Sequence, residues 1–284
     1  MKIVFLSNYF NHHQEPFSDE MFALLGDDYC FIEAERMEQE RVALGWQMKN
    51  LPQYVLQLYV DAEKCQSKIN SADVVITGSA PEYLLNYRKK NNLLIIRYSE
   101  RPLKKIPSCF EFVKIFIALH KNNPLNAPIY MLCASAYTAR DYKKFFVFRG
   151  KTYKWGYFPA RRNYKDVDGL IMRKQRNSIL WVARYIDWKH PELMIRLAEE
   201  LAQSRLNFHI TMIGCGNLEK KIIQEVETNN LKDYFTFCGS ISPENVRDYM
   251  EKSEIFISTS DRNEGWGAVI NESMNSCCAV VANK

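Results

Sequence analysis

No apolar run in the 284-residue sequence approaches the roughly 20 residues that a membrane-spanning helix requires. The apolar core of residues 1–7 is also too short for a signal peptide and meets the polar Asn8 at once, so we expect a first strand there. The hydrophobic content of 47% and the charged content of 25% are typical of a soluble globular protein. The length is sufficient for two domains of ordinary size.

None of the eight cysteines occurs in a C-x-x-C pair. Several of them, such as Cys133 and Cys215, lie in or beside apolar, strand-like runs. This pattern indicates reduced structural thiols in a cytoplasmic protein, and it argues against a zinc site or a disulfide framework.

Acidic residues are scarce between Arg88 and Arg162, where 17 basic residues accompany three acidic ones. Residues 1–165 hold 24 Lys and Arg against 16 Asp and Glu, whereas residues 166–284 hold 14 against 17. A solvated basic face would explain the excess, and so would contact with an anionic membrane surface, an anionic acceptor or a nucleic acid. Because no nucleic-acid motif accompanies the basic stretch, we favour the membrane surface or the acceptor.

Short apolar runs alternate with amphipathic ones along the whole chain. Strands are expected at residues 2–7, 29–32, 74–77, 93–97, 130–133, 178–182, 208–213, 234–237, 255–258 and 279–281. Helices are expected near residues 15–25, 54–69, 81–90, 108–121, 136–145, 191–203, 218–229, 243–252 and 268–276, the one at 243–252 with Ser242 as its capping residue. This alternation predicts an α/β fold with parallel sheets covered on both faces, in two Rossmann-like domains at residues 1–165 and 166–284.

The stretch Glu264-Gly-Trp-Gly-Ala-Val-Ile-Asn-Glu272 follows an apolar run and leads into a helical pattern. It predicts a strand, a glycine-bearing turn and a helix N-terminus, whose unpaired N–H groups and dipole favour a phosphate. Gly265 and Gly267 let the backbone approach a ligand, and the two flanking carboxylates can accept hydrogen bonds from sugar hydroxyls. The combination suits a nucleotide-sugar, although an ordinary helix start with acidic residues placed to suit the dipole has the same pattern.

Other polar side chains follow strands, at the sheet edge where ligands of open parallel sheets bind. Arg184 and Lys189 follow the strand at 178–182, where two cations can hold a diphosphate and stabilise its charge as it departs, although loop cations are also common surface charges. His12 and His13 follow the first strand and would either face a ligand or simply be exposed. Glu100 follows the strand at 93–97.

Gly214 and Gly216 follow the strand at 208–213 and invite a dinucleotide-binding interpretation. The third glycine of that fingerprint is replaced by Glu219, and no acidic partner is evident in the right strand context. A nicotinamide-dependent oxidoreductase is therefore the weaker hypothesis.

Taken in order, residues 178–282 resemble the nucleotide-binding domain of family 4 glycosyltransferases, which have the GT-B fold. The first half resembles the family in its alternation and in residues 131–141. The resemblance implies two domains facing a cleft and the retaining transfer of a sugar from a nucleoside-diphosphate sugar, with no bound metal or other cofactor. It rests on Trp181-Val-Ala-Arg184, Lys189-His-Pro, Met212-Ile-Gly214-Cys-Gly216, Phe237-Cys-Gly239-Ser-Ile241 and Glu264-x7-Glu272.

The same resemblance assigns roles to individual positions. Arg184 and Lys189 would hold the diphosphate and assist its departure. Glu272 would bind the ribose hydroxyls, and Ile241 lies near the position that contacts the base. Glu264 would contact the donor sugar, close to the backbone amides of Gly265, Trp266, Gly267 and Ala268.

The sequence departs from the family pattern in three places. The usual histidine after the fourth N-terminal strand is absent, so Glu100, or His12 or His13, is expected to supply a polar contact instead. Cys277 stands where a glycine with left-handed backbone usually ends the motif helix. The chain stops at Lys284, directly after a strand, where family members continue, so we expect an incomplete second domain.

Asp166 and Asp168 resemble the Asp-x-Asp motif that holds a metal in another class of glycosyltransferases. No apolar strand precedes them and Gly169 follows, so we assign them to a linker formed by residues 161–169, which continues the crossover at 153–159.

The sequence as a whole predicts a retaining glycosyltransferase that moves a sugar to a polysaccharide or glycolipid acceptor held by the basic first domain. We expect it in the cytoplasm or at the inner face of a membrane, without a nucleic-acid partner. The alternative hypothesis is a catalytically inactive family member that binds the nucleotide-sugar without transferring it.

Overall fold

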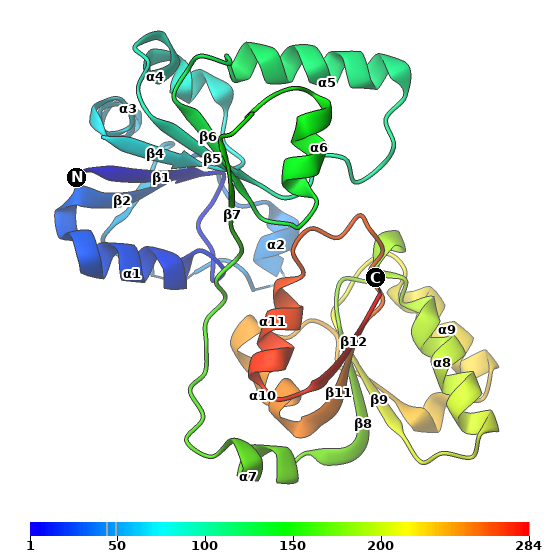
Figure 1. Cartoon of the computed structure of the whole chain (residues 1–284). Helices are drawn as coiled ribbons and strands as arrows, with labels where there is room; N and C mark the ends of the chain where they lie inside the picture. Colours follow the sequence, from blue (N-terminus) through cyan, green and yellow to red (C-terminus); the bar gives the residue numbers. More distant parts are fainter. Residues whose placement is uncertain (44, 49, 284) are drawn as a thin grey trace. The chain divides into compact units, whose positions relative to one another are not determined.

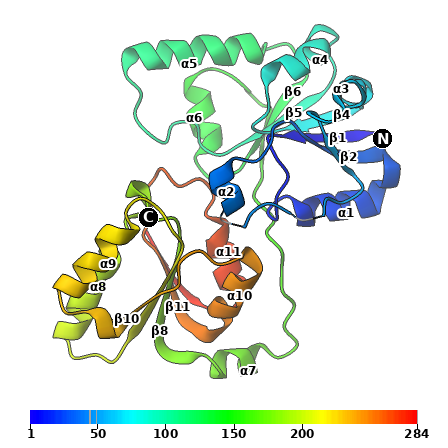
Figure 2. The same cartoon turned by 180° about the vertical axis from the view of Figure 1, so that it is seen from behind.

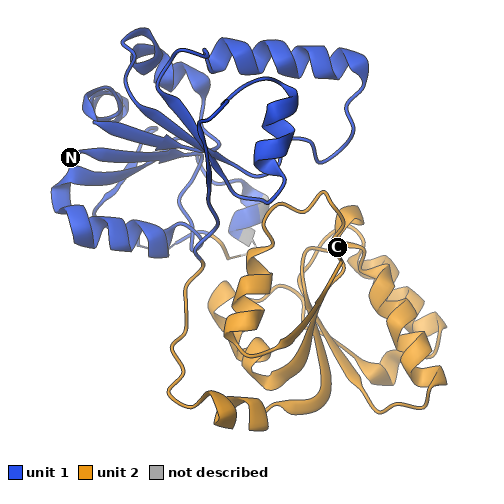
Figure 3. Cartoon of the chain, in the orientation of Figure 1, with its two compact units in different colours: residues 1–42, 47–158 blue, residues 43–46, 159–284 orange. Residues whose placement is uncertain are grey.

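The computed structural model describes residues 1–43, 45–48 and 50–283 (Figure 1). The chain divides into two compact units, Met1–Val42 with Gln47–Phe158, and Ala43–Trp46 with Pro159–Lys284 (Figure 3). The chain thus passes between units at residues 158 and 159, a few residues before the boundary expected at 165 and 166. Lys284, at which the sequence predicts an incomplete domain, lies outside the described residues.

The first unit contains a parallel sheet with the strand order β3-β2-β1-β4-β5-β6-β7. Ile3 pairs with both Tyr29 and Val74, which places the first strand of the chain between the second and the fourth. The strands are β1 (Ile3–Ser7), β2 (Tyr29–Glu33), β3 (Val55–Gln57), β4 (Val74–Thr77), β5 (Ile95–Ser99), β6 (Ile129–Cys133) and β7 (Thr152–Lys154).

Helices cover both faces of this sheet, because successive side chains of a strand point to opposite faces. Ile3 and Phe5 pack with the apolar side of α1 (Glu15–Leu25), whereas Val4 and Leu6 belong to the core on the other face. Figures 1 and 2 show α1 along one face of the sheet. The other helical segments of the unit are η1 (Gly26–Asp28), α2 (Gln39–Ala43), α3 (Ala62–Ser71), η2 (Glu82–Leu85), α4 (Asn86–Lys90), α5 (Cys109–Asn122) and α6 (Thr138–Lys144).

The second unit repeats this architecture with a parallel sheet of order β10-β9-β8-β11-β12. One face is covered by α8 (Glu192–Gln203) and α9 (Glu219–Thr228), and the other by α10 (Pro243–Lys252) and α11 (Ala268–Asn275) (Figure 2). The remaining elements are α7 (Val167–Met172), β8 (Gln175–Val182), η3 (Asp187–Lys189), β9 (His209–Ile213), η4 (Lys232–Tyr234), β10 (Phe235–Phe237), β11 (Ser253–Ser258) and β12 (Ala279–Ala282). The expected α/β fold with two parallel sheets is confirmed.

Several sequence expectations about local structure are wrong. The helix expected at 54–69 begins only at Ala62, because residues 55–57 form the short strand β3 beside β2. The expected crossover at 153–159 begins inside β7, which pairs with β6. The expected linker at 161–169 contains the start of α7, and Asp166 caps that helix by accepting a hydrogen bond from the Gly169 N–H at 2.8 Å.

Two expected helix ends have different outcomes. Ser242 stands at the N-cap of α10, but its side chain makes no capping hydrogen bond, so that part of the expectation is wrong. Cys277, after α11, has a φ of 60°, which confirms the expected left-handed backbone at that position. Among the described residues, no helix is long and apolar enough to cross a membrane.

A buried cation lies inside each unit and donates to backbone carbonyls. The fully buried Arg88 donates to the carbonyl oxygens of Ile69, Ala72, Asp73 and Leu94, at 2.7–3.3 Å. Lys174 donates from its Nζ atom to the carbonyl oxygens of Met250 and Ser253, at 2.8 and 2.7 Å. Both side chains therefore join segments that end or begin strands.

We expect Arg88→Met to destabilise the first unit by about 2–4 kcal/mol, because carbonyl oxygens that it satisfies in the interior lose their donors. Urea unfolding followed by circular dichroism measures the loss. The matched control is Arg149→Met, which alters an exposed arginine of the same unit. A loss no larger than that of the control would contradict the structural role of Arg88.

Candidate functional site

The loops that follow β8, β9 and β10 are joined by backbone hydrogen bonds. Tyr185 donates its N–H to the Cys215 carbonyl at 3.0 Å, and Leu218 donates to the Tyr185 carbonyl at 3.0 Å. Gly214 in turn donates to the Gly239 carbonyl at 2.8 Å. The carboxyl ends of these strands thus form one continuous loop layer.

Gly214 and Gly216 are required by the close packing of this layer. A Cβ at Gly214 would lie 1.9 Å from the Ala183 carbonyl oxygen, and one at Gly216 would lie 2.4 Å from the Tyr185 carbonyl oxygen. Gly214 also has a φ of 136°. Close contact between two loops of the unit therefore accounts for both glycines. These are the glycines that invite the dinucleotide-binding interpretation of the sequence.

The loop after β11 is fixed to the loop after β8 through Thr259. The buried Trp181 donates its Nε1–H to the Thr259 hydroxyl oxygen at 2.8 Å, and that hydroxyl donates to the Lys189 carbonyl. The Asp261 N–H donates to the Trp188 carbonyl at 3.0 Å. These bonds hold two segments together that lie about seventy residues apart in the chain.

Lys189 and Glu264 form an ion pair across these two loops. Burial alone would raise the pKa of Glu264. The charge of Lys189 and the hydrogen bonds from Lys189, Ser260 and the Gly265 N–H outweigh that effect and hold the pKa below its ordinary value. The structure therefore brings together two of the residues that the sequence singles out.

His190 strengthens the same loop contact. Its Nε2 lies 3.4 Å from Asp261 Oδ2, and its Nδ1 lies 2.9 Å from Glu192 Oε1. Hydrogen bonds to Glu192 and Asp261 raise the pKa of His190. Arg184 lies on the loop after β8 as well, with its guanidinium carbon 5.7 Å from the centre of the Trp188 ring.

The predicted helix start after Glu264 is present. Gly267 occupies the N-cap of α11 with a φ of 71°, and Ala268 is the first helical residue. Between them and Glu264 lie Gly265 and Trp266, whose Nε1–H donates to Asn271 Oδ1 at 2.7 Å. Glu264 and its ion-pair partner thus stand beside the N-terminus of α11.

Two further predicted site residues, Glu272 and Ile241, make no contact with the Lys189–Glu264 pair among the interactions of the described residues. Burial raises the pKa of Glu272 to about 7, against the opposing charge of Arg247. Ile241 packs in the apolar cluster of α10 and α11 with Val246 and Val269. Ile241 is partly buried there.

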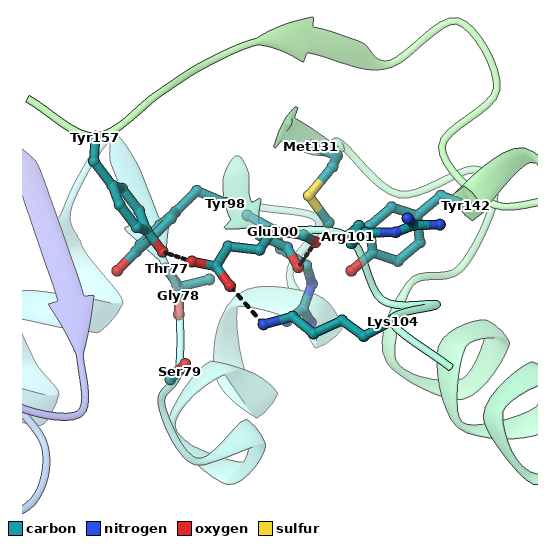
Figure 4. Close-up of a pocket in the computed structure, with 12 residues that line it drawn as sticks. Thr77, Gly78, Ser79, Tyr98, Glu100, Arg101, Lys104, Met131, Tyr142 and Tyr157 are labelled. Carbon is teal, nitrogen blue, oxygen red and sulfur yellow. Dashed lines mark hydrogen bonds and ion pairs between the residues drawn. The ribbon is translucent and has the colours of Figure 1, made fainter. Parts of the chain in front are cut away.

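The first unit holds a polar cavity of about 370 Å³ at the carboxyl ends of β4, β5 and β6 (Figure 4). The carboxylate of Glu100 accepts hydrogen bonds there from the Tyr157 hydroxyl and from Lys104 Nζ, both at 2.9 Å. Burial and the charge of Glu100 raise the pKa of Tyr157, which therefore stays protonated. The lining residues are Thr77, Gly78, Ser79, Arg97, Tyr98, Ser99, Glu100, Arg101, Lys104, Met131, Tyr142 and Tyr157.

His12 and His13 lie in the loop between β1 and α1, with ring centres 4.0 Å apart. Burial lowers the pKa of His12 to about 4, and burial together with the charges of His12 and Arg41 lowers that of His13 to about 3. Both rings are therefore neutral at pH 7. Neither histidine is among the described residues that line the cavity of Glu100.

Several residues of these two sites are not singled out by the sequence patterns. Thr259 and Asp261 join the loop after β11 to the loop after β8. Their position directly after a predicted strand could have indicated a role at the sheet edge. Lys104 lies four residues after Glu100, a spacing that could have indicated the pair. Tyr157 lies 57 residues from Glu100, and no local pattern connects them. In the part of the chain that the structure describes, no group of three or more His, Cys, Asp or Glu side chains is placed to hold a metal ion.

Comparison with known proteins gives a family match for the second unit. Residues 165–284 match the model of the family "Glycosyl transferases group 1". No curated protein matches the chain.

Solved structures show a shared fold over nearly the whole chain. Anabaena HepE, solved in complex with UDP, has a TM-score of 0.65 at 15% identity, over 99% of this chain and 80% of that chain. A variant of S. aureus TarM has a TM-score of 0.68 at 11% identity, over 99% of this chain and 85% of that chain. The pneumococcal O-GlcNAc transferase GtfA has a TM-score of 0.67 at 8% identity, over 99% and 83%. The chain thus shares the fold of these structures, and the family match covers most of its second unit.

The raised pKa of Glu272 predicts a pH-dependent stability. The unfolded chain loses the Glu272 proton near its ordinary pKa of 4.5, whereas the folded chain keeps it until about pH 7. The contribution of Glu272 to the free energy of unfolding should therefore be greatest below about pH 4.5 and should fall as pH rises to about 7. We expect Glu272→Gln to gain stability relative to the wild type across this interval, and the difference to be constant above it. Urea unfolding at several pH values measures this.

The matched control for this pH series is Glu227→Gln, at an exposed glutamate on α9. Its stability relative to the wild type should show no such rise between the two pH values. A flat difference for Glu272→Gln as well would show that the carboxyl ionises normally in the folded chain.

Proposed function

We propose that the chain transfers a sugar from a nucleoside-diphosphate sugar to an acceptor, with retention of configuration. The observation that carries this proposal is the Lys189–Glu264 pair beside the N-terminus of α11, within the residues that match the glycosyl transferase family. A cation for phosphate and a carboxylate for sugar hydroxyls stand side by side there. The comparisons support transfer of a glycosyl group, and the retaining outcome and the residue roles are our proposal.

The donor would be held by residues of the second unit. Lys189 would exchange Glu264 for the diphosphate, and Arg184 on the same loop would supply a second positive charge as the diphosphate departs. The released Glu264 carboxylate would then accept hydrogen bonds from the donor sugar, beside the backbone amides of Gly265, Trp266, Gly267 and Ala268. This arrangement stabilises the leaving group without requiring a metal ion, because the two side chains provide the charge.

The nucleotide would extend along α11. Glu272 lies five residues after Gly267, about one and a half turns along the same helix, and would bind the ribose hydroxyls. Its pKa of about 7 means that it can ionise near neutral pH, when a ligand provides hydrogen-bond donors. Ile241 would contact the base from the neighbouring loop. HepE, TarM and GtfA were each solved with UDP, which makes UDP the first nucleotide to test.

The acceptor would bind in the polar cavity of the first unit. Glu100 is held in place there by Tyr157 and Lys104, so its carboxylate is pre-oriented toward a hydroxyl-bearing ligand (Figure 4). We propose a polysaccharide or glycolipid acceptor, because the lining is mostly polar and includes cations as well as a carboxylate. His12 and His13, neutral at pH 7, are candidates for further contacts with the substrates.

We expect Lys189→Ala to weaken UDP binding by about tenfold or more, the effect of one lost charge-assisted contact. Glu272→Ala should weaken it as well. Isothermal titration calorimetry with UDP, GDP and their sugar conjugates measures both, and Lys221→Ala, at an exposed lysine of α9, is the matched control. Unchanged affinity in Lys189→Ala would remove Lys189 from the donor site. Tight NAD binding that survives Glu272→Ala would favour a nicotinamide-dependent oxidoreductase instead.

We expect Glu100→Gln to leave UDP affinity unchanged and to lower the rate of sugar transfer, because the altered group belongs to the other unit. Transfer to a set of glycan and lipid-linked acceptors is measured alongside UDP titration, with Glu63→Gln at an exposed glutamate of α3 as control. Equal rates for the two variants would exclude Glu100 from the reaction. A wild type that binds a nucleotide-sugar but transfers to no acceptor would favour the binding-only hypothesis.

A further inference from the structure

Helix α5 has two apolar faces, and one of them is uncovered. Its inner face packs against the core of the first unit through Phe112, Ile115, Phe116 and Leu119. On its outer face, Phe110, Val113 and Ile117 are 69%, 53% and 59% exposed. A surface helix normally buries one apolar stripe and shows polar residues on the opposite side.

The exposed side chains form a continuous stripe. Positions 110, 113 and 117 are spaced by three and four residues, so they project from the same side of the helix. Ile106, just before the helix, is 86% exposed. Contiguous exposed apolar side chains on a soluble chain indicate a surface that another apolar phase covers.

Positive charge borders this stripe. Lys105, Lys114 and Lys121 are exposed, and Lys114 Nζ lies 4.3 Å from the centre of the Phe110 ring. The acidic residue of the helix, Glu111, is engaged at its start in a capping box with Ser108.

Not all of the basic excess between residues 88 and 162 contributes to this surface. Arg88 is fully buried, and Arg97 forms two hydrogen bonds with Glu82. The exposed lysines of α5 and of the segment before it belong to the part of the excess that an anionic partner can reach.

We propose that the outer face of α5 lies on an anionic lipid bilayer. Phe110, Val113 and Ile117 insert at the level of the headgroups, and the flanking lysines contact lipid phosphates. The helix of 14 residues is about 21 Å long, which suits a position in the plane of the surface. Apolar side chains with surrounding lysines are the pattern of an interfacial helix.

A second copy of the chain fits this face less well than a bilayer. In a two-fold contact the same patch meets itself, so the lysines of one copy would approach those of the other. Like charges brought together in this way oppose association. A bilayer with anionic headgroups instead neutralises every lysine of the patch.

The experiment uses the full chain and sedimentation with vesicles of phosphatidylcholine, alone or mixed with phosphatidylglycerol. We expect binding to the mixed vesicles that falls with rising salt. Phe110→Ser combined with Ile117→Ser should weaken it by about tenfold or more. The matched control is Leu24→Ser combined with Leu206→Ser, which alters exposed leucines elsewhere and should bind as the wild type does.

A second pair of variants tests the charges. Lys114→Gln combined with Lys121→Gln should weaken binding by about fivefold for each charge lost. Lys220→Gln combined with Lys221→Gln removes two exposed lysines from α9 and should have little effect. Equal losses in both pairs would show general attraction of a basic chain and would overturn the assignment to α5.

Cys109 provides a position-specific probe, since it is the exposed one among the eight cysteines, all of which are described. An environment-sensitive fluorophore on Cys109 should shift to the blue when mixed vesicles are added. No shift, no vesicle binding, or a dimer in light scattering that the Phe110 and Ile117 substitutions dissociate would each overturn the proposal. UDP titration of the same variants keeps this result separate from the proposed donor site, because that site belongs to the second unit.

Discussion

The hydroxyl group of Thr259 makes the contact that attaches the loop after β11 to the loop layer of the second unit. It accepts from Trp181 on β8 and donates to the carbonyl of Lys189, so a single buried side chain joins the ends of β8 and β11. Both loops also carry one member of the Lys189–Glu264 pair. Together with the bond from the Asp261 N–H to the Trp188 carbonyl, this link reduces the entropy cost of bringing the two charges together. Neutral hydrogen bonds between the two loops thus support the ion pair.

Two glycines and two buried cations also hold loops and strand ends together. Gly214 and Gly216 allow backbones to approach where any Cβ would collide with a carbonyl oxygen. Arg88 and Lys174 supply donors to carbonyls that strands and helices leave in the interior. Buried backbone carbonyl groups need hydrogen-bond donors, and the two cations supply them. The parallel sheets can therefore end in tightly packed loops, which is where ligands of such sheets bind.

The sequence predicts the long, regular parts of the fold and the local geometry of its main motif. The turn at Glu264 follows from a strand, two glycines and a helical pattern, all within twenty residues of each other. Strands β3 and β7 are too short to show alternation, since each has three residues, and helix α7 is hidden in a polar stretch. Contacts over long separations are also invisible to local patterns. Neither the pairing of Lys189 with Glu264 nor the support of Glu100 by Tyr157 could be read from spacing, because the sheet order determines which loops become neighbours.

The ion pair of Lys189 and Glu264 has a consequence for selectivity. In the ligand-free chain each group is the other's counter-ion, so the pair itself carries no net charge. A ligand with negative charge alone would take Lys189 and leave Glu264 half-buried and uncompensated, at a cost in desolvation. A ligand that presents phosphate to one partner and hydroxyl groups to the other compensates both. In the proposed donor site the pair would therefore favour a sugar joined to a phosphate over a simple anion.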